Sequence, residues 1–456
     1  MYKNRAYISF LTLLLTVFFV GCASFGERNL KIRSDFDNGQ LEHAKKQIET
    51  QLQKSRAKDA DVLKLNQALI ELCTGKPKNA ERILREVRDN FDRIEREQLT
   101  KKAEKTVSML TDDNTVSYAG EDYEKVLIRV FLSLANLMHD GTDAAAYALQ
   151  VNQKQNEIIE NGKLKNPKDG KEVNSKLSYK QVSAGAYLYG LLREETRLNN
   201  DDAVRAYLSV CQWNPQFQQG KNDLQRAMHG IHSAPGNGVV YVFCLAGSGP
   251  YKVQENSEVT QAALFLTSFL LSILGNHSVT PGIAPVLIPV VAHSPYPVPV
   301  IQVEINGRDA GITETLTDIR RMAEEQFEAI KAEVIARAVV RRAVKKGILY
   351  GAKEAMNADP WISLALDVAG IIWEANEKAD TRCWNLLPAE IQVLRIELPA
   401  GVHRLRLSLL NNRRSYKDSS TIFRQQEVRV DAGRNTYVLA CCPNSGFAGE
   451  VVVSER

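Results

Sequence analysis

The feature that most constrains the fold is a change of pattern at residues 233–238, Ser-Ala-Pro-Gly-Asn-Gly. Before this turn-rich stretch, over residues 35–230, apolar residues such as Leu41 and Ala44 recur every three or four positions, which is typical of amphipathic helices. After it, the string VVYVFCL starting at Val239 has the β-branched and aromatic residues that favour a buried strand. We therefore predict an α+β chain with a helical N-terminal half and a mixed second half that ends in strands.

The helical half contains a recurring turn that indicates a repeat. The strings GQLEHA, GKPKNA and GTDAAA each place a glycine five residues before an alanine. The pairs are Gly39 and Ala44, Gly75 and Ala80, and Gly141 and Ala146. A fourth segment has Ala203, Tyr207 and Pro215 at the spacing of a tetratricopeptide repeat. Glycine turns the chain between two helices and alanine lets them approach closely. The match is partial, since Lys64 and Glu71 occupy positions expected to be bulky, so a generic helical bundle stays the alternative to a tetratricopeptide-like array over residues 34–230.

Residues 237–310 are predicted to be rich in strands and to include one very apolar helix. The string AALFLTSFLLSIL at residues 262–274 is too short to cross a bilayer, so we expect a buried helix, with a membrane-facing or partner-facing segment as the alternative. Asn306-Gly307 is a turn signal between two extended segments.

Residues 311–378 are predicted to be helical, and residues 379–456 to be an antiparallel, sandwich-like module. Thr315 and Asp318 have the spacing of a helix-capping box, and residues 361–375 form a second apolar helical segment. Alternating apolar residues on both sides of residues 399–401 and again around residues 431–433 predict two hairpins.

The start of the chain predicts its location. Lys3 and Arg5 precede a charge-free apolar run that ends in the string LTLLLTVFFVGC at residues 11–22, as in a secretory leader. Gly21 followed by Cys22 resembles the processing site of bacterial lipoproteins, at which the cysteine becomes the lipid-modified first residue. We expect a leader at residues 1–21, lipidation of Cys22, and a tether at residues 22–33. An ordinary secretory leader with an incidental cysteine is the alternative.

Composition and motifs argue against several classes of function. The net charge of +4 over 456 residues is too balanced to indicate nucleic-acid binding. The GSGP turn at residues 247–250 lacks the lysine of a phosphate-binding loop, so no nucleotide is expected. The cysteines other than Cys22 are scattered without zinc spacing, and His229 with His232 has no further ligand nearby in the sequence. We predict no metal, no cofactor and no enzymatic activity.

Two groups of residues are candidates for binding. The first is the basic face of a long helix, which could meet anionic lipid or an acidic partner, or be a solvated surface. It consists of Arg337, Arg341, Arg342, Lys345 and Lys346. The second is Asp380, Arg382 and Trp384, which could form a recognition cluster or lock a turn through a local ion pair.

Three strings carry a resemblance to a known family. They are ADTRCWNLLPAEIQVLRIELPAGVHRLRL (residues 379–407), IARAVVRRAVKK (335–346) and EDYEKVLIRVFLSLANL (121–137). Together they resemble an uncharacterised family of bacterial envelope lipoproteins with a tetratricopeptide-like front half. Its members are often encoded beside lipoproteins similar to activators of penicillin-binding proteins. The resemblance implies a location and neighbours, not a reaction.

These observations predict an adaptor that is anchored by lipid and faces the periplasm from the outer membrane, if the cell is Gram-negative. We expect its helical array to bind envelope proteins through a concave surface, with a role in cell-wall assembly. An accessory lipoprotein of an export or secretion pore is the second hypothesis. An enzyme that acts on cell wall or polysaccharide is the third.

Overall fold

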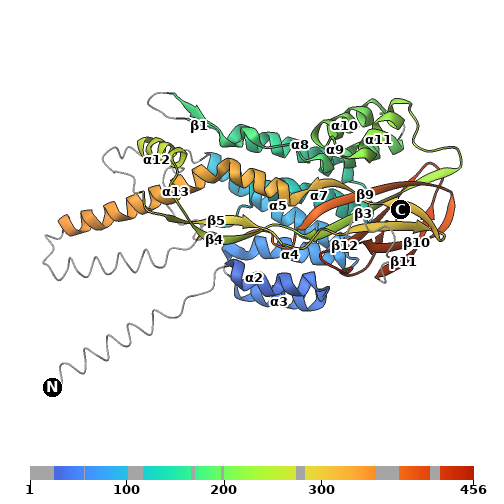
Figure 1. The fold of residues 1–456 in the computed structure, drawn as a ribbon, viewed down its shortest axis with the longest axis horizontal. Coiled ribbons are helices and arrows are strands. Elements are labelled where there is room, and N and C mark those ends of the chain that lie inside the picture. Colours follow the sequence, from blue (N-terminus) through green and yellow to red (C-terminus); the bar gives the residue numbers. More distant parts are fainter. Residues whose placement is uncertain are drawn as a thin grey trace, which may run out of the picture.

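The computed structural model describes residues 25–55, 57–100, 117–165, 170–196, 200–273, 283–355, 379–410 and 422–455. Within these ranges, helices form the N-terminal half of the chain and β-strands predominate in the C-terminal half, as Figure 1 shows. The prediction of a mixed α+β fold with the helices first and the sheets last is confirmed. The predicted leader, Cys22 and the predicted helix at residues 361–375 lie outside the described residues.

The helices of the first half pack in chain order, each against the next. They are α2 (Phe25–Asp37), α3 (Leu41–Lys54), α4 (Ala60–Cys73), α5 (Pro77–Thr100), α7 (Asp122–Leu137), α8 (Ala144–Asn161), α9 (Ser183–Thr196), α10 (Asn200–Trp213) and α11 (Gln218–Met228). The three repeat glycines have φ values of 73°, 72° and 65°, a left-handed conformation that ends a helix and favours glycine. These glycines therefore set the turns between successive helices. We call helices α2–α11 the helical layer.

The alanine five residues after the glycine is buried in two of the three strings. Ala44 and Ala80 are fully buried, as close helix packing requires. Ala146 is exposed, and Ala144 is buried instead, because α8 begins three residues after its glycine whereas α3 and α5 begin two residues after theirs. The prediction for Ala146 was therefore wrong in register.

The expected tether at residues 22–33 is wrong from Phe25 onward, because these residues form the first part of α2. Ile32 is fully buried, and Arg33 donates hydrogen bonds to the carbonyls of Asn385 (2.9 Å) and Gly249 (2.7 Å). The helix is therefore held by contacts with residues more than 200 positions away, which the local sequence does not reveal.

A five-stranded sheet covers one side of the helical layer. Its strand order is β13-β12-β3-β9-β8, with β3 antiparallel to β9 and parallel to β12. The bounds are β3 (Asn237–Ser248), β8 (Glu314–Asp318), β9 (Pro388–Pro399), β12 (Asn435–Cys442) and β13 (Val452–Val453). Alternate side chains of β3 point to opposite faces, and both faces are buried. Val239, Tyr241, Phe243 and Leu245 pack with the helices, whereas Val240, Val242, Cys244 and Ala246 belong to a second apolar cluster.

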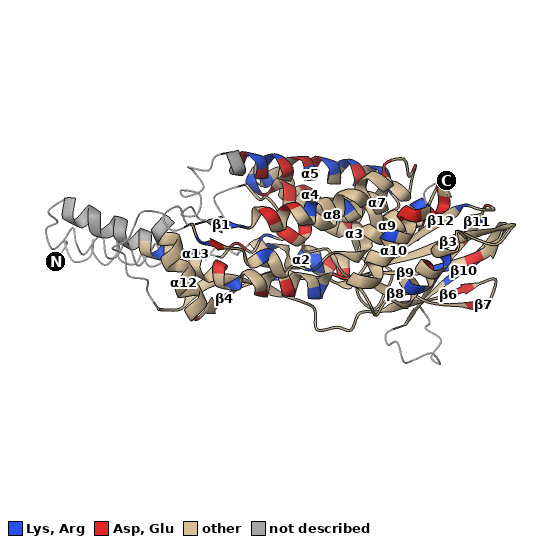
Figure 2. Ribbon diagram, turned by 90° about the horizontal axis from the view of Figure 1, so that it is seen from above, with Lys and Arg blue, Asp and Glu red and all other residues tan. Residues whose placement is uncertain are grey.

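The second cluster is shared with a four-stranded sheet of order β11-β10-β6-β7. Its strands are β6 (Val300–Ile305), β7 (Arg308–Ile312), β10 (Gly401–Leu410) and β11 (Phe423–Val430). The predicted turn at Asn306-Gly307 is confirmed, because both residues have positive φ (52° and 78°) and join β6 to β7. The helical layer, the five-stranded sheet and the four-stranded sheet thus lie one on another in that order (Figures 1 and 2).

The two predicted hairpins at residues 399–401 and 431–433 are wrong. Strand β9 belongs to the five-stranded sheet and β10 to the other, and β11 and β12 are likewise in different sheets. The turns are real, but β9 already has β3 and β8 as neighbours, so the chain crosses to the second sheet instead of folding back. The alternation of apolar residues in the sequence is the same for a hairpin and for a chain that crosses from one sheet to the other.

An arm projects from the body (Figure 1) and consists of four elements. They are a ribbon of β4 (Tyr251–Ser257) and β5 (Val286–Ala292), with α12 (Gln261–Ile273) and α13 (Ile319–Ala355). Side chains of α13 pack against the ribbon and α12 in two small apolar clusters. No helix within the described ranges has the length and apolar character needed to cross a membrane.

The start of α13 differs from the prediction. Thr315 lies in β8, so the proposed capping box with Asp318 does not exist. The helix begins at Ile319, and Asp318 Oδ1 instead accepts a hydrogen bond from the backbone N–H of Arg321 at 2.9 Å. Beside α13, the chain that follows α8 forms a short ribbon of β1 (Leu164–Lys165) and β2 (Glu172–Val173), then a 3-10 turn (Ser175–Ser178). Ser175 from this turn donates a hydrogen bond to Glu333 of α13 at 2.9 Å.

Candidate functional site

The basic face of α13 is largely engaged in contacts within the protein. Arg342 donates hydrogen bonds to the carbonyls of Ala284 (3.1 Å) and Pro285 (2.7 Å), just before β5, and Arg337 pairs with Glu333 one turn away. Arg341 is half-buried on the same helix. The side chains of Lys345 and Lys346 lie outside the described part of the structure. The described arginines therefore help to hold the arm together and do not form an open basic surface.

Asp380, Arg382 and Trp384 are brought together, but Arg382 and Trp384 are buried and Asp380 is half-buried. Arg382 is 2% exposed and binds Asp380 at 2.7 Å and Asp59 of the helical layer at 3.2 Å. The ring of Trp384 is fully buried, 5.1 Å from that of Phe131 on α7. A surface recognition cluster is therefore the wrong interpretation of these residues. They join the segment before β9 to the helical layer.

A buried carboxyl group that sequence analysis missed lies beside Trp384. Glu124 on α7 accepts hydrogen bonds from the Trp384 backbone N–H (2.6 Å), from the Tyr118 hydroxyl and from the backbone N–H of Glu121 (3.2 Å). Burial, followed by the nearby charge of Glu121, raises the pKa of Glu124 to about 7. Lys252 from β4 pairs with Glu121. The sequence gives little signal, because Glu124 lies between two other charged residues, Asp122 and Lys125, at the start of the helix DYEKVLIRVFLSLANL.

The surroundings of Glu124 have little contact with solvent. Burial raises the pKa of the Cys383 thiol to about 12 and raises that of the Tyr118 hydroxyl, so both groups stay protonated near neutral pH. Glu124 can therefore hold a proton at the junction of the helical layer and the sheet, where the Tyr118 hydroxyl and the Trp384 backbone N–H already bind its carboxyl oxygens. We assign it to the stability of the fold.

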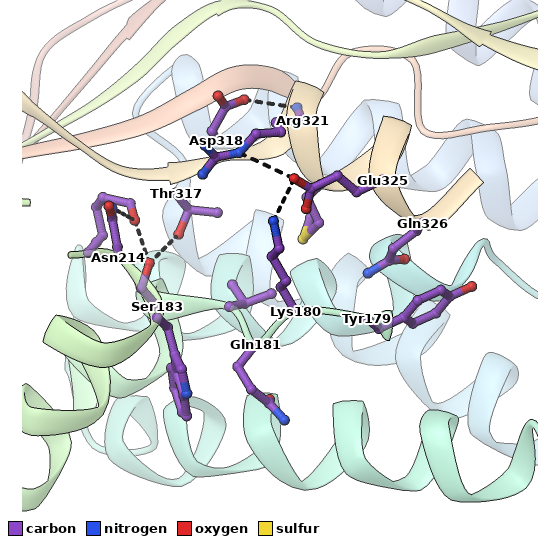
Figure 3. A pocket seen from close by; sticks show the side chains of 14 residues that line it. Tyr179, Lys180, Gln181, Ser183, Asn214, Thr317, Asp318, Arg321, Glu325 and Gln326 are labelled. Carbon is purple, nitrogen blue, oxygen red and sulfur yellow. Dashed lines mark hydrogen bonds and ion pairs between the residues drawn. The ribbon is translucent and has the colours of Figure 1, made fainter. Parts of the chain in front are cut away.

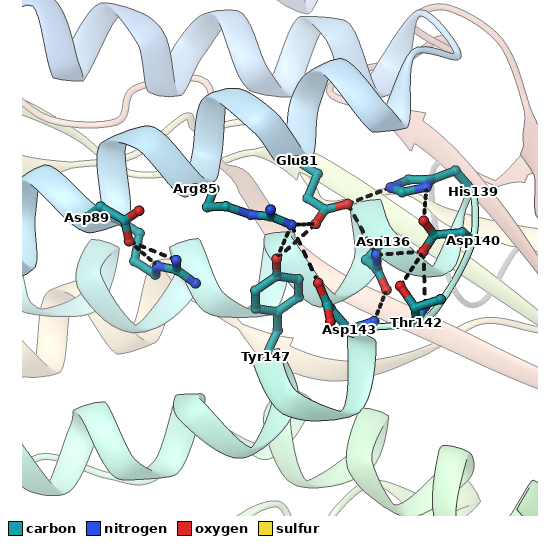
Figure 4. A network of polar contacts seen from close by, with 10 residues as sticks. Glu81, Arg85, Asp89, Asn136, His139, Asp140, Thr142, Asp143 and Tyr147 are labelled. Carbon is teal, nitrogen blue, oxygen red and sulfur yellow. Dashed lines mark hydrogen bonds and ion pairs between the residues drawn. The ribbon is translucent and has the colours of Figure 1, made fainter.

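A polar network joins α5, α7 and α8 on the other side of the helical layer (Figure 4). Glu81 is its centre and accepts hydrogen bonds from Tyr147 (2.8 Å) and Asn136 (3.2 Å), and its carboxylate lies 2.5 Å from His139 Nε2. Arg85 donates to the Tyr147 hydroxyl at 2.7 Å. Burial alone would raise the pKa of Glu81, but the hydrogen bonds from Asn136, Tyr147 and His139 bring it below its ordinary value.

A charged groove continues from this network along the same two helices, α5 and α8. We call it the α5–α8 groove, and its empty volume is about 850 Å³, including open solvent at its mouth. Its lining includes Arg88, Asp89, Asp92, Gln150, Gln153 and Lys154. Figure 2 shows how densely basic and acidic residues follow one another on α5.

The floor of the α5–α8 groove is held by buried ion pairs. Asp92 lies 2.7 Å from Arg129 of α7 and 3.3 Å from Lys154 of α8, and both basic side chains are almost fully buried. Burial would raise the pKa of Asp92, but the charges of Arg129 and Lys154 lower it. Asp89 and Gln153 at the rim are exposed. The groove therefore combines a floor held by ion pairs with exposed polar side chains at its rim, where Asp89 pairs with Arg88 at 2.7 Å.

A second hollow, of about 530 Å³ including its open mouth, lies where the helical layer meets β8 and α13 (Figure 3). Ser183 donates a hydrogen bond to the carbonyl of Leu316, and Asn214 donates to that of Thr315 at 3.0 Å. Lys180 pairs with Glu325 of α13 at 2.8 Å. These polar groups already bind one another across the junction, so the hollow is a contact between layers and not a candidate catalytic site.

Comparisons with known proteins identify no relative. No protein-family model, no curated protein and no solved structure matches the chain. Among the described residues, no three histidine, cysteine, aspartate or glutamate side chains are placed to hold a metal ion. The functional argument therefore starts from the α5–α8 groove and the arm.

Proposed function

We propose that the protein is a lipid-anchored adaptor of the cell envelope that acts in cell-wall assembly and binds a partner protein through the α5–α8 groove. The proposal rests on one observation: the side of the helical layer that faces away from the five-stranded sheet is open. Helix α7 is buried along its whole length, and the side of the layer next to the five-stranded sheet is filled by that sheet. The five-stranded sheet thus occupies the surface on which a partner's peptide was expected to bind. The α5–α8 groove is the alternative binding surface.

We also propose that the helices within residues 34–230 are tetratricopeptide-like and that the two sheets form a β-sandwich. The left-handed turn glycines at Gly39, Gly75 and Gly141, and the chain-order packing of the helices, support the first assignment. The apolar cluster shared by β3, β10 and β12 supports the second.

The anchor is tested separately from the groove. The Cys22→Ser variant should lose its lipid and leave the membrane fraction, whereas the unchanged chain should sediment with membranes. A variant that still sediments after removal of its leader would contradict the lipid anchor. It would leave the groove proposal intact, because the groove does not depend on the anchor.

The groove is tested by adding charge at its rim without removing a buried pair. Asp89→Lys combined with Gln153→Lys should reduce recovery of the partner after in-cell crosslinking and affinity capture at least tenfold. Gln425→Lys on the exposed strand β11 is the matched control. Equal recovery from all three proteins would contradict the proposal. Capture of cell-wall synthesis proteins by the unchanged chain would assign the pathway, and capture of export components would favour the second hypothesis.

The arm favours that second hypothesis, an accessory lipoprotein of an export or secretion pore. Phe265 on α12 is 60% exposed although the helix is mostly apolar, and the arm projects away from the body (Figure 1). Under this hypothesis α12 meets lipid or a pore protein. Labelling of α12 by a photoactivatable lipid, or its crosslinking to a pore protein, each reduced in Phe265→Ser, would support the hypothesis. An α12 that gives neither product would exclude it.

A further inference from the structure

Two cysteines from opposite ends of the chain face each other between the helical layer and the five-stranded sheet. Cys73 is the last residue of α4 and is 2% exposed, and Cys441 on β12 is 4% exposed. Both belong to the same apolar cluster. Both thiols are free in this structure, and they lie close enough for Cys73 to affect the ionisation of Cys441. They are 368 positions apart in the sequence, so only the fold brings them together.

The backbone after β12 holds this pair in place. The Ala448 N–H donates to the carbonyl of Cys441 at 2.8 Å, and the Glu450 N–H donates to the carbonyl of Cys73 at 3.0 Å. Between them, Gly449 passes so close that a Cβ atom there would lie 2.0 Å from the Cys73 carbonyl oxygen. Residues 448–450 therefore fasten the end of α4 to β12 and fix the positions of both cysteines.

A second cysteine pair lies on the opposite face of the sheet and serves as an internal comparison. Both of its thiols are also free, and Cys244 likewise affects the ionisation of Cys442. In the parallel pairing of β3 with β12, however, Cys442 is opposite Ala246 and Cys244 is opposite Ala440. This offset of two residues separates the Cα atoms by about 8 Å for regular strands, which is beyond the usual reach of a disulfide. The second pair is therefore not suited to a disulfide.

We propose that Cys73 and Cys441 form a disulfide that links α4 to β12, while Cys244 and Cys442 stay reduced. The proposal rests on the proposed envelope location, because secreted and periplasmic proteins encounter oxidants that the cytosol excludes. The bond would join the helical layer covalently to the five-stranded sheet. It would thereby keep the sheet in place over the face of the helices that we infer to be closed to partners.

The bond forms by thiol–disulfide exchange with an external disulfide, such as that of an envelope oxidoreductase. One cysteine thiolate attacks the external disulfide, forms a mixed disulfide and releases one external thiolate. The other cysteine, as its thiolate, then attacks the mixed disulfide and releases the second external thiolate. The protein loses two protons and two electrons, and the external disulfide becomes two thiols.

We expect the disulfide to form while the protein folds and not in the folded protein. Both thiols are buried, and the hydrogen bond with Cys73 and burial raise the pKa of Cys441, so the folded protein holds little reactive thiolate. We therefore expect the bond to form before the helical layer closes on the sheet, and to resist reductants until the protein unfolds.

The test is a two-label map of the cysteines in a chain that starts at Ala23, so that Cys22 is absent, refolded in a glutathione redox buffer. The protein is denatured without reductant and alkylated with iodoacetamide, then reduced and labelled with N-ethylmaleimide. Cys73 and Cys441 should carry the second label, and Cys211, Cys244, Cys383 and Cys442 the first. A non-reduced digest should contain one peptide pair joined through Cys73 and Cys441, two hydrogens lighter than the separate peptides.

The proposal would be overturned if both Cys73 and Cys441 carried iodoacetamide, or if either were joined to a different cysteine. This result is independent of location, which the Cys22→Ser fractionation decides. A second measurement uses the thermal midpoint. Reductant added to the denatured protein before refolding should lower the midpoint of the unchanged chain and of Cys211→Ser, but not that of Cys73→Ser with Cys441→Ser. An equal effect of reductant on all three proteins would also count against the bond.

Discussion

At the scale of single residues, the buried charged groups belong to the fold. Arg382 was a candidate for recognition because arginine and tryptophan often anchor interfaces. The structure places it against Asp380 and Asp59, with 2% of its surface exposed. The sequence could predict the local pair with Asp380, two residues away, but not the contact with Asp59, because that contact depends on how distant segments pack. Glu124 was not predicted for the same reason.

Replacing Arg382 by Met should destabilise the protein by about 3–5 kcal/mol, because the half-buried Asp380 would be left without its partner. Urea unfolding measures the effect. The matched control is Arg342→Met, whose side chain binds only backbone carbonyls near the surface and which should cost about 1 kcal/mol or less. If Arg382→Met unfolded at the same urea concentration as the unchanged chain but lost its partner, recognition would be the correct role.

Glu124 should make stability depend on pH. Because its pKa is about 7 in the folded protein and ordinary when unfolded, the folded state binds more protons between these values. Its contribution is therefore complete below pH 4.5 and is lost as the pH rises towards 7, by about 3 kcal/mol in total.

The variant Glu124→Gln isolates this contribution. Its stability relative to the unchanged chain should rise between pH 4.5 and 7.5, measured by urea unfolding at several pH values. Glu49→Gln, at an exposed position of α3, should follow the unchanged chain throughout. A constant difference between Glu124→Gln and the unchanged chain across this range would show that Glu124 is ionised in the folded state.

At the scale of elements, local patterns predicted which segments are helices and strands better than how they pair. The helical period and the repeat glycines identified the helical layer, and Asn306-Gly307 identified a real hairpin turn. Residues 399–401 have the same appearance, yet they connect two different sheets. The short strand β8 was predicted as helix, because Thr315 and Asp318 have capping spacing and its pairing with β9 is not visible locally.

The contact of residues 448–450 with the end of α4 gives a prediction at this scale. Gly449→Ala should be strongly destabilising, because its Cβ would overlap the Cys73 carbonyl oxygen. Gly230→Ala is the matched control, since Gly230 has a similar positive φ but open space around it, and should cost only about 1–2 kcal/mol. Urea unfolding compares them. Equal costs would mean that residues 448–450 can move away from α4.

At the scale of the whole molecule, the order of the layers decides where a partner can bind. The repeat predicted an array with an open concave surface, and it could not reveal that the C-terminal half returns to cover one side of that array. The contact between Tyr187 of α9 and Tyr241 of β3, 6.4 Å between ring centres, is one of many across this junction. The outer α5–α8 groove then becomes the surface on which the proposed function depends.

Site-specific photo-crosslinking in cells tests this central claim most directly. A benzophenone amino acid is placed at position 153 in the α5–α8 groove or at position 425 on strand β11, and the adducts are compared by mass. The account predicts a discrete adduct with another protein from position 153 and none from position 425. Adducts from position 425 alone would contradict it, because they would place the partner on the sheets and not on the outer face of the helices.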